Sequence, residues 1–227
     1  MIVSRDNEKL KLVRKLHERR WRDKLGQFAV EGEDLVVAAR DAGIEPVELL
    51  VAGENVEPEL LADVSTLPHP PRVVGVYRRD DLPRGTRPVT LALWRVADPG
   101  NVGTLLRSAD AFAAGVALSA GCADPTSPKA LRASMGAIFR VPLAGWDEPS
   151  GTRVALVPRG GVPLPELPLH GEVVLVLGAE REGLPADVLA ACEARASIPQ
   201  PGRAESLNVA MAGTVALYEL VRRSQRP

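Results

Sequence analysis

Three segments combine glycine, proline and polar side chains in patterns that suit a ligand-binding site. They are DPGNVGTLLRSADAF (98–112), VVLVLGAEREGLP (173–185) and ASIPQPGRAESLNVAMAGT (196–214). Arg107, near the start of an expected helix, could grip a phosphate. The glycines around Glu180 allow a tight turn and a close approach of the backbone to a ligand. Asn208 enters an apolar helix, where an unpaired buried amide costs about 1–3 kcal/mol and therefore needs a partner.

Each of these residues also has an ordinary structural explanation. Arg107 could be a solvated surface arginine, the Glu180 loop a charged turn, and Asn208 part of a capping network. The chain contains neither a glycine-rich dinucleotide fingerprint nor a Walker-type lysine loop. The two cysteines lie far apart and the three histidines are scattered, so we expect two buried thiols and no metal site or disulfide framework.

The elements around these segments predict how they meet. Apolar runs LALWRV, GVALS, RVALV and EVVLVLG alternate with helical segments, a pattern typical of a mostly parallel sheet with helices on both faces. Ligands bind outside the carboxyl ends of strands in such sheets. The sequence therefore predicts an α/β fold in which the three segments form one site. Asn101 is the expected N-cap of the first helix, and Ser206 that of the last.

The final expected helix, residues 207–223, differs from an ordinary surface helix. Its first turns, LNVAMAGTVAL, are apolar or small on every side. A helix without a polar face is normally buried all round. We expect it to pack inside the fold or in a dimer interface. By contrast, VPLPELP at 162–168 predicts a proline-rich loop.

Charge is unevenly distributed along the chain. The net charge is −1, yet residues 1–24 hold nine basic and four acidic side chains. Leu10, Val13 and Leu16 recur at helical spacing, so the basic side chains fall mainly on the outer face of an expected amphipathic helix, capped by Ser4 or Asp6. A basic arm on an acidic body indicates a polyanion partner. The alternative is a solvated helix without a partner.

Composition shifts divide the chain. Residues 1–80 predict a compact α/β unit with strands near 28–30, 47–51 and 73–77 and a helix near 33–42, residues 81–88 a linker, and residues 89–227 the larger domain. Hydrophobic residues make up 45% and charged residues 25%, as in ordinary globular proteins. No apolar run approaches the roughly 20 residues of a membrane span, and the N-terminus lacks a secretory pattern, so we expect a cytoplasmic protein.

In order and spacing, the three segments resemble the signature motifs of the SpoU/TrmH class of RNA 2'-O-ribose methyltransferases, within the SPOUT superfamily. The motifs are N-x-G-x-x-x-R, G-x-E-x-x-G-L and I-P-x…S-L-N-V-A, and the match covers about residues 88–227. Residues 7–16 and 28–32 resemble, less specifically, the family's small α/β RNA-binding domain. The resemblance implies a SPOUT-type trefoil-knotted sheet preceded by that domain, a homodimer with its site at the interface, and S-adenosylmethionine bound in the knot.

The resemblance also assigns residues by motif. It implies a catalytic set of Asn101, Arg107, Glu180, Ser206 and Asn208. It implies cofactor contacts at Leu177, Gly178, Glu180, Ile198, Leu207 and Ala210. The basic residues that we expect to bind RNA are Arg14, Arg19, Arg20, Arg22, Lys24 and Arg132. Ala179, Arg181 and Gln200 replace the asparagine, glycine and methionine that are common in the family.

The implied reaction is methylation of a ribose 2'-hydroxyl in structured RNA, with ribosomal RNA favoured. In this family the residue matching Arg107 is often proposed as the base. A guanidinium stays protonated in proteins, so we expect Arg107 to hold the neighbouring phosphate. The alternatives are a transfer-RNA ribose methyltransferase, a base methyltransferase, or a catalytically silent RNA-binding ribosome assembly factor. A nucleotide-binding oxidoreductase is disfavoured by the missing fingerprint.

Overall fold

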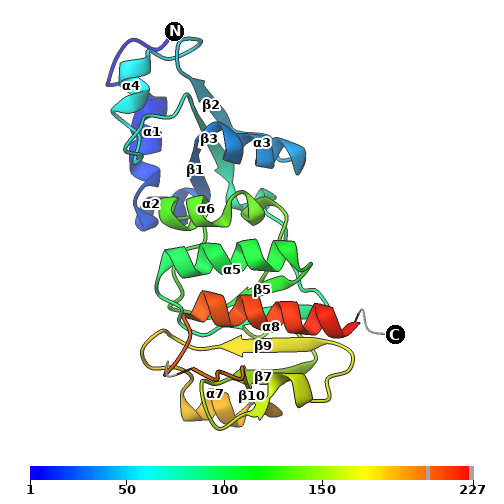
Figure 1. The fold of residues 1–227 in the computed structure, drawn as a ribbon. Helices are drawn as coiled ribbons and strands as arrows, with labels where there is room; N and C mark the ends of the chain where they lie inside the picture. The colour runs from blue at the N-terminus through cyan, green and yellow to red at the C-terminus, as the bar shows by residue number, and fades with distance from the viewer. Residues whose placement is uncertain (203–204, 225–227) are drawn as a thin grey trace.

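The protein contains a small sheet and a large sheet, stacked end to end (Figure 1). The computed structural model describes residues 1–202 and 205–224. A three-stranded sheet of order β1-β3-β2 lies at the N-terminal end, and a seven-stranded sheet of order β6-β5-β4-β9-β7-β10-β8 lies below it. Among the described residues, neighbouring strands of the small sheet pair antiparallel and those of the large sheet pair parallel.

The N-terminal region contains the predicted strands and helices, with α4 added and the predicted basic helix divided into α1 and α2. Its elements are α1 (Glu8–Leu16), α2 (Arg19–Leu25), β1 (Gln27–Glu31), α3 (Glu33–Asp41), β2 (Glu48–Val51), α4 (Pro58–Ala62) and β3 (Val73–Arg78). Leu10, Val13 and Leu16 are buried, as their spacing predicts. The cap of α1 is Asn7, not Ser4 or Asp6, because the Asn7 side chain accepts the backbone N–H of Lys9.

The basic segment forms two helices instead of one. α1 ends at Leu16, and α2 begins after an extended residue, Glu18. Gly26 then ends α2 with φ of 63°, a left-handed conformation that glycine adopts without strain. The basic segment is therefore two short helices and not the single amphipathic helix that the spacing predicts.

The larger region contains the four predicted long strands and three short ones. Its elements are η1 (Arg79–Asp81), β4 (Val89–Leu93), α5 (Pro99–Ala111), β5 (Gly115–Leu118), α6 (Pro128–Ser134), η2 (Ala137–Phe139), β6 (Leu143–Gly145), β7 (Thr152–Leu156), β8 (Val162–Pro163), η3 (Leu164–Glu166), β9 (Val173–Leu177), α7 (Ala186–Ala190), β10 (Ala194–Ser197) and α8 (Val209–Ser224). β8 and η3 occupy most of the segment 162–168, predicted to be a loop. Just before it, the carbonyl of Gly161 accepts the hydroxyl of Ser197 on β10.

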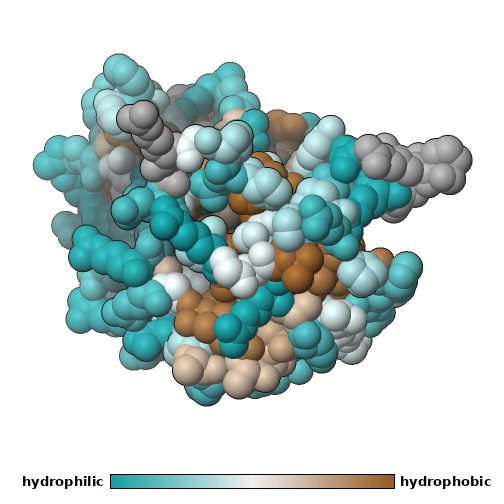
Figure 2. Space-filling model, turned by 60° about the horizontal axis from the view of Figure 1, so that its bottom comes forward, coloured by the Kyte–Doolittle hydropathy of each residue, from teal (hydrophilic) through white to brown (hydrophobic). Residues whose placement is uncertain are grey.

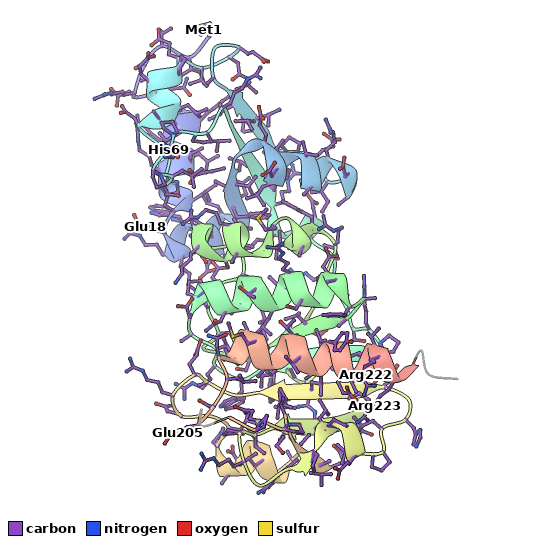
Figure 3. All side chains as sticks on the ribbon, in the orientation of Figure 1. Met1, Glu18, His69, Glu205, Arg222 and Arg223 are labelled. Carbon is purple, nitrogen blue, oxygen red and sulfur yellow. The ribbon has the colours of Figure 1, made fainter. Side chains whose placement is uncertain are left out.

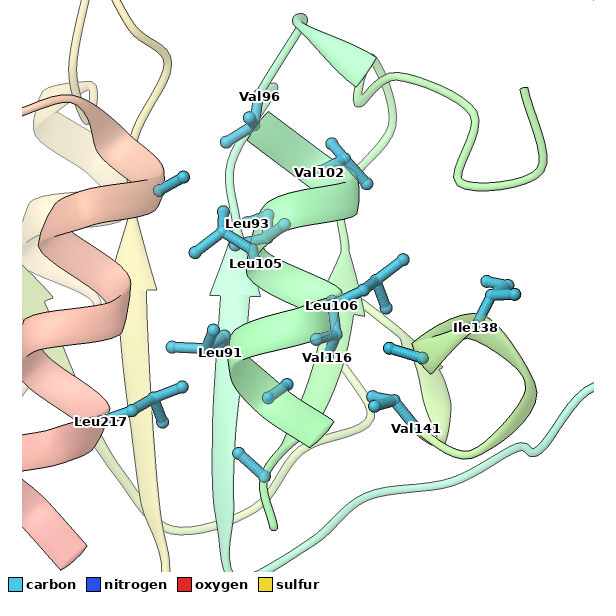
Figure 4. Close-up of a cluster of buried hydrophobic side chains, with 14 of the residues drawn as sticks. Leu91, Leu93, Val96, Val102, Leu105, Leu106, Val116, Ile138, Val141 and Leu217 are labelled. Carbon is cyan, nitrogen blue, oxygen red and sulfur yellow. The ribbon is translucent and has the colours of Figure 1, made fainter. Parts of the chain in front are cut away.

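Helices α5 and α8 form a layer over one face of the large sheet, and α6 packs between α5 and β1 of the small sheet (Figure 1). Figure 4 shows Leu105 and Leu106 of α5 among the sheet residues Leu91, Leu93 and Val116, with α8 beside them. On α8, Gly213 permits this closeness, since a Cβ there would lie 2.4 Å from a Leu105 methyl carbon. The opposite face of the sheet carries a smaller apolar cluster that includes Val188 of α7.

Its own chain buries only one face of the final helix, so packing inside the fold accounts for part of the prediction, and the dimer interface stays a prediction. α8 buries Ala210, Ala216 and Leu217 against the sheet layer, but it exposes Met211, Val215 and Tyr218. These three side chains, which we call the α8 stripe, recur at positions i, i+4 and i+7 and so share one face of the helix. The described chain therefore leaves an apolar surface without a partner.

The two regions share one apolar core. Phe28 and Tyr77 of the small sheet pack against Phe139 of η2, with ring centroids 6.1 and 5.4 Å apart. Beside these rings, a buried arginine of α2, Arg22, donates to Asp124 at 2.7 Å. The junction is therefore an apolar, ion-paired contact instead of a loose tether.

Within the described residues, no helix is long and apolar enough to cross a membrane. The trefoil knot stays a prediction of the resemblance.

Candidate functional site

A cleft of about 770 Å³ opens at the carboxyl ends of β7, β9 and β10, within the range typical of small-molecule sites. Figure 2, which turns the lower end of Figure 1 toward the viewer, shows apolar patches gathered among hydrophilic surface on this face. The second and third motif segments line the cleft together with residues 156–160 after β7. Its apolar lining includes Leu156, Leu177, Leu184, Leu189, Ile198 and Leu207.

The floor of the cleft is a tight backbone turn after β9. Ala179 and Gly183 exchange backbone hydrogen bonds of 3.2 and 3.0 Å. A Cβ on Gly178 would lie 2.3 Å from the carbonyl carbon of Gly183, so this position accommodates only glycine. Gly183 itself has φ of 67°. The two glycines thus permit the tight turn that their spacing predicts, in which two stretches of the chain's own backbone approach each other.

Glu180 is the centre of a hydrogen-bond network that joins the three segments. Its carboxylate accepts the backbone N–H of Ala97 at 3.2 Å and of Asp98 at 3.1 Å. It also accepts the side-chain amide of Asn101 at 3.0 Å. The oxygen of Asn101 in turn accepts the Asn208 amide at 3.1 Å. We call Glu180, Asn101 and Asn208 the cleft network.

The surroundings of Glu180 keep its carboxyl group ionised. Partial burial raises the pKa of this group, but the hydrogen bonds from Asn101 and from backbone amides outweigh burial and lower the pKa below its usual value. Glu180 is therefore a carboxylate at neutral pH. It acts as an acceptor that positions donors, because it carries no proton to give.

Both helix caps differ from those predicted. Asp98 caps α5, accepting the backbone N–H of Gly100 at 2.5 Å, and its second carboxylate oxygen binds Lys129 at 3.0 Å. Asn101 lies inside the first turn, which frees its side chain for Glu180. At α8, Asn208 caps the helix by accepting the N–H of Ala210 at 2.9 Å. Ser206 lines the cleft instead.

Two predicted site residues neither belong to the cleft network nor line the cleft. Arg107 is exposed on the outer face of α5, and within the described residues its side chain forms no hydrogen bond or ion pair. Ala210 is 3% exposed and contacts the cleft network through its backbone N–H, which donates to Asn208. The remaining members of the predicted catalytic and cofactor sets lie in the cleft network or line the cleft.

The predicted RNA-binding residues separate into exposed and engaged side chains. Arg19, Arg20 and Lys24 are exposed on α2, whereas Arg14, partly exposed on α1, donates to the carbonyl of Arg5 at 3.0 Å. Arg132 is exposed on α6, where it donates to the hydroxyl of Thr66 at 3.1 Å.

Arg22 departs most from that expectation. Its side chain is 3% exposed and donates to Asp124 and to the carbonyls of Leu16 and His17. In this structure it serves the domain junction and is not available to RNA.

The sequence interpretation missed three cleft arginines. Arg159 follows β7, Arg181 lies in the Glu180 loop and Arg195 lies on β10, and all three line the cleft. Within the described chain none of them pairs with a carboxylate. Arg159 could have been found from the sequence, because it follows the strand RVALV and ligands bind beyond the carboxyl ends of strands in such sheets.

The arrangement combines an apolar cleft, a fixed amide–carboxylate network and unpaired arginines. Such a site can bind a small molecule with an apolar body beside an anionic polymer. Within the described residues there is no group of three or more histidine, cysteine, aspartate or glutamate side chains placed to hold a metal ion.

Comparisons with known proteins agree with this geometry. The family model described as the SpoU rRNA methylase family matches residues 88–218, and the model of an MRM3-like substrate binding domain matches residues 7–77. A 23S rRNA (guanosine(2553)-2'-O)-methyltransferase of Bacillus subtilis is 31% identical, over 96% of this chain and 98% of that protein. A 23S rRNA (uridine(2479)-2'-O)-methyltransferase of Streptomyces viridochromogenes is 32% identical, over 91% of this chain and 86% of its own length.

Solved structures extend the similarity to the whole chain. A crystal structure of an AdoMet-bound rRNA methyltransferase from Sinorhizobium meliloti has a TM-score of 0.86 and 31% identity, covering 100% of this chain and 98% of that one. The match includes both sheets and the junction between them. Sequence motifs, cleft and architecture thus lead to one assignment: this chain belongs to the SpoU rRNA methylase family.

Proposed function

We propose that this protein transfers a methyl group from S-adenosylmethionine to a ribose 2'-hydroxyl of ribosomal RNA. The observation that carries the proposal is the cleft network, which ties the three motif segments together at one edge of a 770 Å³ cleft. The two relatives named above, both 23S rRNA 2'-O-methyltransferases by name, favour ribosomal RNA as the substrate. We assign residues 1–80 to substrate binding, 81–88 to a linker and 89–227 to methyl transfer.

The cleft fits S-adenosylmethionine by the chemistry of its lining. Leu177, Ile198 and Leu207 offer apolar surface for the adenosine. The side-chain oxygen of Gln200 is buried without a hydrogen-bond partner among the described residues. A buried acceptor of this kind is costly unless a ligand donor meets it, and the amino and hydroxyl groups of the cofactor are donors.

When bound, S-adenosylmethionine supplies a methyl group activated by its sulfonium. The protein's task is then to align the ribose with that group and exclude water, an effect that is sensitive to displacements of about 1 Å. Glu180 and Asn208 fix Asn101 from two sides, which leaves Asn101 little freedom. Arg159 and Arg195 give the cleft positive charge for the RNA backbone.

We propose that a second copy of the chain completes the site, which would give the exposed Arg107 a role. Arg107 and the α8 stripe lie on helices of the same layer and are both exposed. A homodimer that buries the α8 stripe would cover the outer face of α5 and bring Arg107 to the partner's cleft. There Arg107 would hold the phosphate beside the target ribose, since its guanidinium stays protonated.

Mixed dimers test this arrangement. Arg107→Ala and Asn208→Ala should each abolish methyl transfer as homodimers. Random mixing of the two should restore about one quarter of wild-type activity, because half of the dimers are mixed and each of these has one intact site. No recovery on mixing would place Arg107 and Asn208 in the same subunit's site.

The reaction itself is tested with labelled cofactor. Ribosomal RNA from cells that lack the gene is incubated with the protein and methyl-tritiated S-adenosylmethionine and then digested to nucleosides. We expect the label in a 2'-O-methylnucleoside. Label in a methylated base would make the protein a base methyltransferase. Absence of both label and cofactor binding by calorimetry would favour a silent assembly factor.

A further inference from the structure

α2 carries an aromatic side chain surrounded by cations. Trp21 lies partly exposed on this helix. The ammonium groups of Lys15 and Lys24 are each 5.2 Å from the centroid of its ring, and the guanidinium carbon of Arg20 is 5.6 Å away. Cation–π pairs of significant energy occur about once per 70–80 residues. Three cations on one surface ring therefore form an unusual concentration, which core packing does not require.

These cations are available to an anionic partner. Lys15 and Lys24 are exposed, and within the described residues neither forms an ion pair with a carboxylate. Arg20 pairs with Glu18 at 2.7 Å, but both side chains are more than half exposed, and such pairs are worth about 0–1 kcal/mol. The acidic residue within α2, Asp23, lies 2.7 Å from the Arg79 guanidinium.

α2 is docked at the same sheet edge as the cleft. Arg22 ties α2 to Asp124, which lies in the loop after β5. β5 is parallel to β4, and β4 is parallel to β9, so the carboxyl ends of all three strands meet at one edge. β9 leads into Glu180. In Figure 3, Glu18, which precedes α2, and Glu205, which precedes the cleft residue Ser206, both lie on the left side of the view.

We propose that Trp21, with Lys15, Arg20 and Lys24, forms a stacking platform for an unpaired base of the RNA substrate. The proposal rests on the proposed function in that it takes RNA as the substrate. An indole ring can stack any base, and the surrounding cations can move to the flanking phosphates. Trp21 thus binds single-stranded RNA at a distance from the methylated ribose and takes no part in the chemistry.

Two RNA probes separate stacking from general charge attraction. The full-length protein is titrated with an oligouridylate of about 12 nucleotides, a length that a single binding module can cover, and with a duplex of equal length. Trp21→Ala should weaken oligouridylate binding about tenfold, as expected for one lost stacking contact, and duplex binding less than about twofold. Trp21→Phe, which keeps an aromatic face, should retain most of the affinity. The double variant Lys15→Ala/Lys24→Ala should weaken both probes and flatten their salt dependence.

Indole fluorescence gives a readout that folding defects do not imitate. Oligouridylate should quench the wild type more than Trp21→Phe, because only the wild type has an indole at the platform. Equal quenching in both proteins, or unchanged oligouridylate affinity in Trp21→Ala, would overturn the proposal. So would an equal loss for both probes. A protein that binds oligouridylate through Trp21 but transfers no methyl group would refute the proposed function and leave this inference standing.

Discussion

Two polar networks lie at the same edge of the large sheet and differ in exposure. We call Arg22, Asp124 and Arg79 the junction network. Asp124 lies in the loop after β5, and the side chains of Arg22 and Asp124 are 3% and 7% exposed. In the cleft network, Asn101 lies in the helix after β4 and Glu180 in the loop after β9, and Glu180 and Asn208 line the cleft. Both hold carboxylates whose pKa is lowered, although burial opposes ionisation in each.

The difference in exposure indicates that the junction network holds the two regions together and that the cleft network serves the reaction. In the junction network, desolvated charges satisfy one another, so removal of one member leaves an uncompensated buried charge. In the cleft network, the partners are amides around one carboxylate, and a ligand can reach them. We therefore expect substitutions in the junction network to change stability, and substitutions in the cleft network to change activity.

The largest expected effect on stability is that of Arg22→Met. Loss of the guanidinium removes the more buried of the two arginines that pair with Asp124 and leaves the carbonyls of Leu16 and His17 without their donor, so the free energy of unfolding should fall by about 3–5 kcal/mol. Urea denaturation measures this change. Arg19→Met on the same helix, where the side chain is 61% exposed, is the matched control and should change stability by less than about 0.5 kcal/mol. Equal effects of the two variants would refute the structural role of the junction network.

Glu180→Gln should instead act on turnover. The amide retains the size of the carboxylate but presents a donor toward backbone N–H groups, so Asn101 loses its fixed position. We expect methyl transfer at saturating substrates to fall about 100-fold, with a change in unfolding free energy below about 1 kcal/mol. Glu182→Gln, on the same loop, is the control and should stay within about threefold of the wild type. A stability loss as large as that of Arg22→Met would erase the distinction between the networks.

The pH dependence of stability should also report on the junction network. The folded-state pKa of Asp124 is lowered: burial raises it, but hydrogen bonds from Thr126 and Arg22 and the charge of Arg79 prevail. Its stabilising contribution is therefore fully present above the unfolded value of about 3.9 and is lost as pH falls through the folded pKa. Comparing unfolding free energies at pH 3 and pH 6, we expect a smaller loss on acidification in Asp124→Asn than in the wild type. An equal loss would exclude this contribution.

The smallest effect is expected at the edge of the cleft network. Lys129 pairs with Asp98 at 3.0 Å, and both side chains are largely exposed. Exposed pairs contribute about 0–1 kcal/mol. Lys129→Met should therefore lower the melting temperature only slightly and leave cofactor affinity, measured by calorimetry, unchanged. A large loss of stability would show that the Asp98 cap of α5 needs the ion pair with Lys129, which would contradict this prediction.

The sequence predicted most of the site but less of the sheet. Polar residues after apolar strands must meet at one sheet edge, and Glu180, Asn101 and Asn208 do so. β6, β8 and β10 escaped prediction because they are two to four residues long and lack continuous apolar runs. These strands are fixed by pairing with neighbouring strands that are distant in the sequence, and the periodicity of a short segment contains no information on such pairing.

Arg22 and the α8 stripe show two further limits of sequence patterns. A basic run identifies an electrostatic surface, but it cannot tell which member turns inward toward Asp124, a residue distant in the sequence. An all-apolar helix indicates burial without saying what buries it. α8 satisfies that pattern on one face through the fold, and we propose that a second copy of the chain covers the other.

The most direct test of the central claim is a map of ribose methylation across total RNA. Cells with the wild-type gene, cells lacking it and cells carrying Asn101→Ala are compared. The account predicts a 2'-O-methyl group in ribosomal RNA that is present in the wild type and missing from both other strains. Identical maps in all three strains, or a loss confined to transfer RNA or to methylated bases, would contradict it.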